Sequence, residues 1–87
     1  METWEKSLEM RGMKRIEIVN YFINIKGKSI GNGKFASEGW EVYIGEEIII
    51  KLGSLKIPST TVIFRCKKET LERMILAFRL KFLTAGG

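Results

Sequence analysis

Residues 39–66 carry the densest β-branched and aromatic pattern in the chain, and they constrain the fold most. Apolar side chains alternate with other residues in three runs, at residues 40–44, 48–52 and 61–66. A period of two is typical of strands that place one face on a core. Gly45 and Gly53 separate the runs, and Pro58 predicts a turn or a sheet edge at residues 55–58, because proline has no N–H for a central strand. The segment is predicted to form a sheet.

The spacing of polar side chains predicts a helix over residues 13–26. Glu17, Asn20 and Asn24 fall on one helical stripe, whereas on a strand they would lie on both faces. Gly27 is expected to end this helix. The side chains expected to form the apolar arc are Ile16, Val19, Phe22 and Ile23, with Ile18 and Ile25 at its flanks.

A second helix is predicted after residue 66, where the apolar period changes again. Its stripe, spaced for one helical face, consists of Leu71, Met74, Ile75, Phe78 and Phe82. Leu76, Leu80 and Leu83 lie largely off that stripe, so more than half of the circumference is apolar. Such a helix either lies between two layers or has a second partner. We therefore expect a homodimer or a covered groove at these three leucines, and an oligomeric scaffold is one possible role.

The remaining segments complete the predicted order. Residues 3–10 have the parity of a strand near an edge, residues 28–34 form a turn-rich connection around Asn32-Gly33, and residues 34–37 form a short strand. The prediction is a single α+β domain over residues 1–87. Its order is strand, helix, four strands and helix, with an antiparallel sheet and both helices on one face.

Composition restricts the chemistry more than the fold. The 87 residues include no His, no Asp and no Gln, and all 10 acidic residues are Glu. His bases, Asp-rich calcium loops and most zinc sites are thereby excluded, and the lone Cys66 is expected to be a buried structural thiol. We predict no catalytic residues, no metal, no cofactor and no enzyme activity. The adjacent Glu46 and Glu47 are expected to be exposed charge.

The first residues, the composition and the net charge of the chain predict its location in the cell, its source and the charge of its partners. The first residues carry no apolar signal region and no run is long enough for a membrane span, so a cytoplasmic protein is expected. Abundant Lys, Glu and Ile without Gln suggests a thermophile. The net charge of +5 would favour an anionic partner.

Four features of the sequence together resemble a known family. They are the run Leu52-Gly53-Ser54-Leu55-Lys56-Ile57-Pro58, the alternating strand after it, the helix that begins with glutamates and the final Gly-Gly. Together they resemble a domain of unknown function that follows the ubiquitin-like part of some MoaD-related proteins, which are similar to the small subunit of molybdopterin synthase. The resemblance implies a fold like that of the TATA-binding protein (TBP). It also implies a link to molybdenum- or tungsten-cofactor assembly or sulfur transfer, a role in which a protein partner would be expected. The ubiquitin-like part has no counterpart in this sequence.

Gly86 and Gly87 are the candidate residues for sulfur transfer. Ubiquitin-like sulfur carriers end in Gly-Gly because the terminal carboxylate threads into an activating enzyme through a channel too narrow for a side chain. Here the tail follows a predicted helix rather than the last strand of a β-grasp fold. Two glycines can also simply end a helix, so an inert terminus remains the alternative.

Lys26, Lys28 and Lys34 are candidates for binding nucleic acid. They cluster around a glycine-rich loop, and Trp40 or Tyr43 could offer a stacking surface, a combination that single-strand binders use. The alternative is that the lysines are solvated and Trp40 is in the core, as its parity with Val42 indicates. The loop lacks the spacing of a phosphate-binding P-loop, so a turn is the favoured interpretation.

Overall fold

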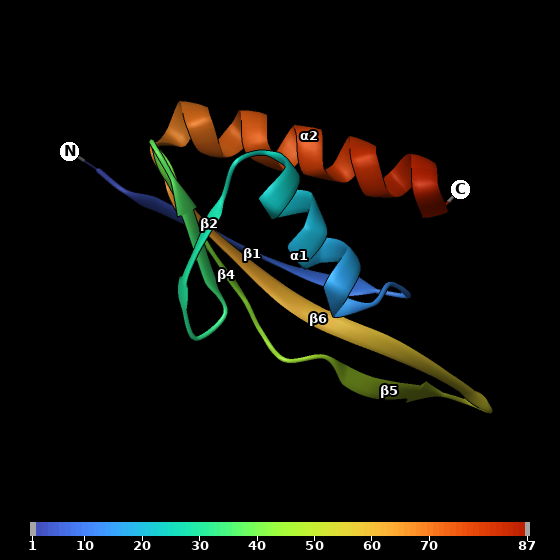
Figure 1. Cartoon of the computed structure of the whole chain (residues 1–87). Coiled ribbons are helices and arrows are strands. Elements are labelled where there is room, and N and C mark those ends of the chain that lie inside the picture. The colour runs from blue at the N-terminus through green and yellow to red at the C-terminus, as the bar shows by residue number, and fades with distance from the viewer. Residues whose placement is uncertain (1, 87) are drawn as a thin grey trace.

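The computed structural model describes the backbone of residues 2–86 and the side chains of residues 2–82. The chain forms one antiparallel sheet with two helices over one of its faces (Figure 1). The predicted α+β class and antiparallel sheet are confirmed. In chain order the elements are β1 (Trp4–Arg11), α1 (Arg15–Asn24), β2 (Lys28–Gly31), β3 (Lys34–Ser37), β4 (Trp40–Ile44), β5 (Ile48–Leu52), β6 (Leu55–Cys66) and α2 (Lys68–Gly86).

The sheet is built around β6, its longest strand. β6 pairs with β1 along one side, and along the other with β4 and then β5. β3 and β2 extend the sheet beyond β4, which gives the order β1-β6-β4-β3-β2. Val62 and Phe64 of β6 are fully buried whereas Thr61 and Arg65 are exposed. The alternation in the sequence therefore marks the face that meets the helices.

Pro58 lies inside β6 at the point where one neighbouring strand ends. Its carbonyl oxygen accepts a hydrogen bond of 2.9 Å from the backbone N–H of Gly12, just beyond the end of β1. Because the N and C=O of a strand residue point to the same side, the nitrogen of Pro58 also faces Gly12, and the missing N–H falls just beyond the last paired residue of β1. The predicted edge position is confirmed, within a strand rather than a turn.

Aromatic side chains from both helices meet over β6. Phe22 of α1 and Phe78 of α2 are fully buried with ring centroids 5.5 Å apart, and each also contacts Phe64 of β6, at 5.8 and 5.3 Å. Pairs of this kind contribute roughly 0.5–1.5 kcal/mol beyond the area that they bury. The rest of the buried apolar core is formed by Ile18, Phe35, Val42, Ile44, Val62, Cys66, Leu71 and Phe82.

The prediction of four strands between the helices is wrong, because the structure has five. The segment expected to be a connection contains β2. All four residues of β2 are exposed, so neither face of this strand lies on the core and its sequence shows no apolar alternation. The predicted Asn32-Gly33 turn creates this strand. Both residues have positive φ, 51° and 78°, which folds β2 back onto β3 as a hairpin.

The predicted apolar arc of α1 is rotated from the observed one. Ile18 and Phe22 are fully buried, while Ile16 and Ile23 are 58% and 51% exposed. Apolar residues surround most of this short helix, so polar positions alone could not fix which arc faces the sheet. The bulky Phe22, which packs on Phe64 and Phe78, decides the orientation.

The end of α1 also differs from the prediction. Lys26, with φ 77°, takes the left-handed position, and its N–H bonds to the oxygen of Ile23. The N–H of Gly27 bonds to the oxygen of Phe22 at 2.8 Å, which completes a Schellman motif. Glycine is required at position 27 for space, because a Cβ there would lie 2.7 Å from that oxygen and from the Trp40 ring.

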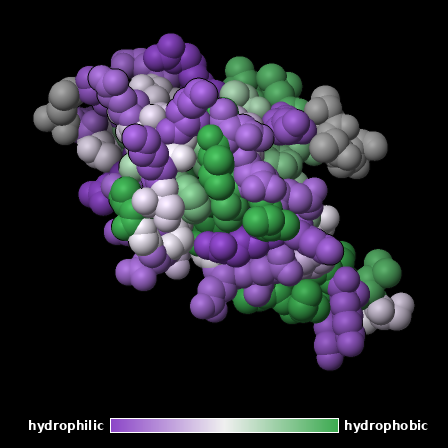
Figure 2. All heavy atoms as spheres, in the orientation of Figure 1, coloured by the Kyte–Doolittle hydropathy of each residue, from purple (hydrophilic) through white to green (hydrophobic). Residues whose placement is uncertain are grey.

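The hairpin of β5 and the first half of β6 projects from the helix-covered part of the sheet (Figure 1). Figure 2 shows apolar atoms at the end of this hairpin, over α1 and over α2. The most exposed apolar side chains of the hairpin are Ile48, Ile49, Leu52 and Leu55. Neither described helix is long and apolar enough to cross a membrane.

Candidate functional site

The predicted sulfur-transfer tail lies at the end of α2. The backbone of Gly86 closes this helix, whereas Gly87 and the side chains from Leu83 onward lie outside the described residues. The tail therefore follows a helix and not a strand, as the sequence predicted. Gly86 is the last residue of this helix, and glycine is common where helices end.

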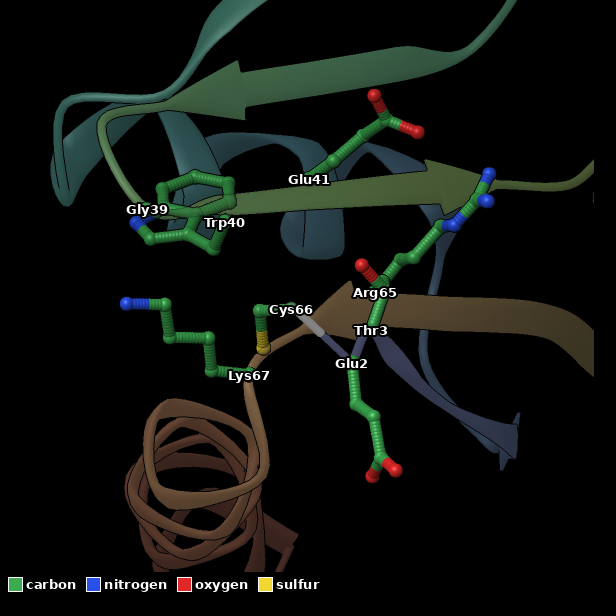
Figure 3. A pocket seen from close by; sticks show the side chains of 8 residues that line it. All are labelled: Glu2, Thr3, Gly39, Trp40, Glu41, Arg65, Cys66 and Lys67. Atoms are coloured by element: carbon green, nitrogen blue, oxygen red, sulfur yellow. The ribbon is translucent and has the colours of Figure 1, made fainter.

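A shallow hollow of 340 Å³ lies where β6 passes into α2, and Cys66 lies within it between Trp40 and α2 (Figure 3). Cys66 is only 6% exposed, and burial raises the pKa of its thiol. A thiol of raised pKa is protonated at neutral pH and is a poor nucleophile. The prediction of a buried cysteine is confirmed, and this hollow offers no activated sulfur.

The three candidate lysines do not share one surface. In the strand register Lys28 pairs with Ala36 and Lys34 with Tyr43, so both lysines lie on the sheet face opposite the helices. Lys26 instead lies in the connection after α1. Trp40 packs on the helix side, its ring centroid 5.8 Å from that of Phe22. The structure therefore brings Tyr43, and not Trp40, beside Lys34.

The open sheet face carries charges of both signs. The register aligns Glu5, Arg65 and Glu41 in one row across β1, β6 and β4. Lys34 and the 39% exposed Tyr43 lie in the neighbouring row, two residues further along each strand. The face is basic only at the side of β2 and β3, which limits any anionic ligand to that side.

The leucines predicted as an interface lie on an exposed flank of α2. Leu76 is 61% and Leu80 is 56% exposed, whereas the side chain of Leu83 lies outside the described residues. Leu76 also borders an apolar groove of 440 Å³ between α2 and β1. The other side chains that line this groove are Trp4, Lys6, Lys68, Leu71, Glu72, Ile75 and Arg79.

Arg15 and Glu47 form a connection that the sequence did not indicate. The carboxylate of Glu47 accepts a 2.7 Å hydrogen bond from the backbone N–H of Arg15, in the first turn of α1. The Arg15 side chain donates to the carbonyl oxygens of Gly45 and Ile44 at 2.8 and 3.1 Å. Glu46 and Glu47 are both exposed, as predicted. Glu47 also caps a helix, which the prediction of exposed charge alone did not include. Arg15 and Glu47 are 32 positions apart in the sequence, which explains why no local motif revealed their contact.

Within residues 2–86, no three His, Cys, Asp or Glu residues are grouped closely enough to hold a metal ion.

A profile of the archaeal MoaD-like protein family matches residues 6–87. The chain belongs to this family. No curated protein sequence matches the chain significantly. In this MoaD-like protein the matched region contains both helices, nearly the whole sheet and the Gly86-Gly87 pair. The resemblance to MoaD-related proteins is thus confirmed at the level of the family.

Proposed function

We propose that this MoaD-like protein is a small, non-enzymatic sulfur carrier or accessory protein of molybdenum- or tungsten-cofactor assembly. The family match, which extends through Gly86 and Gly87, is the observation that carries the proposal. In this function a partner enzyme converts one oxygen of the Gly87 carboxylate into part of a leaving group, and a sulfide-level sulfur nucleophile then displaces that group to form a thiocarboxylate. The folded body presents the tail to the partner and performs no chemistry itself.

The distribution of reactive groups in the described residues supports a non-enzymatic role. The Cys66 thiol is buried with a raised pKa, and Glu47 is engaged as a helix cap. Paired acid and base groups must converge in a pocket for catalysis. Here the reactive position is instead a chain end without side chains, which a narrow channel in a partner can accept.

The test is the intact mass of the protein isolated from its native cells. We expect a fraction in which one oxygen is replaced by sulfur, located at Gly87 by fragmentation. Gly87→Ala should abolish this fraction while its melting temperature stays unchanged. Gly45→Ala is the matched control and should leave the fraction unchanged, because Gly45 has no positive φ and a Cβ there would meet its neighbours at 3.4–3.9 Å, which is ordinary van der Waals contact. A carboxylate that is unmodified in repeated preparations contradicts the proposal.

A TBP-like fold, and descent from the domain that follows the ubiquitin-like part of MoaD-related proteins, are part of the proposal. The arrangement of β4 and β5 supports the fold: both pair with the same side of β6, residues 62–66 and 55–59, so they occupy the place of one interrupted strand. With these two counted as one, the order becomes strand, helix, four strands and helix. Superposition of an experimental structure on TBP repeats is the test, and a different strand order contradicts it.

Binding of single-stranded nucleic acid is the second candidate function. Lys34 lies directly across from the exposed Tyr43 on the open sheet face, which pairs a phosphate contact with a stacking surface. Tyr43→Ala and Lys34→Glu should each weaken binding of an oligonucleotide, measured by fluorescence anisotropy. Lys51→Glu is the control, because Lys51 is exposed on the distant β5. Absence of binding at low salt rules out this function.

A further inference from the structure

β1 is an edge strand with an apolar groove above it. Among the described strands it pairs with β6 alone, over residues 4–11. A long edge presents a row of N–H and C=O groups that can pair with another strand. On the helix side of this edge lies the groove bordered by Trp4 and Leu76, which are 45% and 61% exposed. A partner that added a strand to β1 would therefore also cover the flank of α2.

A second copy of the chain fits this edge because β1 is complementary to itself. Its side chains alternate, with Trp4, Lys6, Leu8 and Met10 toward the helices and Glu5, Ser7, Glu9 and Arg11 on the open face. In an antiparallel pair of β1 strands around a two-fold axis normal to the sheet, both copies keep their helices on the same face. This symmetry requires a register in which one residue lies on the axis, directly opposite the same residue of the other copy.

Charge selects one of the two registers that pair the most residues. With Ser7 on the axis, Glu5 of each copy lies opposite Glu9 of the other copy, which makes two such pairs. Like charges directly opposite one another are destabilising. With Leu8 on the axis, Glu5 lies opposite Arg11 of the partner copy and Ser7 lies opposite its Glu9, each twice. The second register replaces two repulsions by two attractions, and it places Leu8 against its own copy.

The position of α2 agrees with an axis at Leu8. The Lys68 Nζ lies 5.4 Å from the centroid of the Trp4 ring, so α2 begins level with Trp4 and then runs along β1 (Figure 1). Leu8 is about 13 Å further along the strand, a distance that a helix covers in about nine residues. That places the axis beside Ala77, between Leu76 and Leu80.

We propose that two copies of this protein associate through antiparallel pairing of their β1 strands, centred on Leu8. The sheets become one continuous sheet of both copies. The α2 helices lie side by side across the axis, and Leu76 and Leu80 are buried between them.

Charge reversal tests the register directly by sedimentation equilibrium over a concentration series. Wild type is expected to be a dimer. Glu5→Arg and Arg11→Glu should each weaken self-association by about tenfold or more, because each places like charges opposite one another at two positions. An equimolar mixture of the two variants should form a heterodimer, since both pairs are then complementary. The double variant should dimerise as wild type does.

Two leucine variants test the helix contact. Leu76→Glu should abolish the dimer without loss of the fold, since Leu76 is 61% exposed. Leu55→Glu, at a 63% exposed leucine of the β5–β6 hairpin, is the matched control and should leave the dimer unchanged. A wild-type protein that stays monomeric at every concentration overturns the proposal. So does a dimer that Glu5→Arg strengthens, which would indicate the register centred on Ser7, or one that only Leu55→Glu dissociates.

Discussion

Thr60→Val is expected to stabilise the protein, although it removes a polar group from a sheet. Thr60 lies on the core face of β6 with 0% exposure, and its Oγ1 has no hydrogen-bond partner among the described residues. A buried hydroxyl without a partner costs roughly 1–3 kcal/mol of desolvation. Valine keeps the branched shape and β propensity of threonine and removes this cost. At the lower end of that range, the free energy of unfolding should rise by about 1 kcal/mol.

Urea unfolding measures this change. For a domain of this size the m-value is about 1 kcal/mol/M, so the midpoint should rise by about 1 M, and the melting temperature by about 4–8 °C. Thr60→Ser is the control, because it keeps the hydroxyl and removes the methyl group, and it should destabilise by about 1 kcal/mol. If the valine variant is less stable than wild type at an unchanged m-value, Oγ1 has a hydrogen-bond partner and the reasoning is wrong.

Three further perturbations test local features. Glu47→Ala removes the acceptor for the Arg15 N–H and should lower the free energy of unfolding by about 1 kcal/mol in a urea titration, whereas an unchanged midpoint would show that the cap is not formed. The Ser59 hydroxyl, 2.9 Å from Glu9, holds the pKa of that carboxyl below its ordinary value. The hydrogen bond contributes stability above the pKa that this carboxyl has in the unfolded chain, and the contribution is lost as the pH falls through the pKa of the folded protein. Glu9→Gln should therefore destabilise the protein more at about pH 7 than at about pH 3. An equal effect at both pH values would contradict the assignment. Lys26→Gly relieves a φ of 77° and should stabilise the fold by about 0.5–1 kcal/mol, seen as a higher melting temperature, while Lys26→Ala should not.

Several parts of the fold follow from local patterns in the sequence. The alternation of Val62 and Phe64 with Thr61 and Arg65 identifies the core face of β6, because a strand exposes one side. The dipeptide Asn32-Gly33 identifies a tight turn, because both residues tolerate positive φ. The helical spacing of α2 and the absence of His and Asp are equally local, and the missing residue types limit the chemistry whatever the fold.

Other parts depend on contacts between distant residues. β2 has no apolar alternation and exists because it is bonded to β3. The buried arc of α1 is set by Phe22 packing on two other phenylalanines, from β6 and α2, and no pattern within α1 encodes that choice.

The candidate sites divide in the same way. The sequence determined that a Gly-Gly pair ends the chain and that Leu76 and Leu80 lie off the main stripe of their helix, since both features are read from neighbouring residues. Only the tertiary structure decided that Tyr43 rather than Trp40 lies beside Lys34 and that Glu47 caps α1. It also decided that β1, which the sequence predicted to lie near an edge, borders the exposed flank of α2. The physical reason is that strand pairing and helix packing join residues tens of positions apart, and their energies depend on the complete arrangement rather than on any one segment.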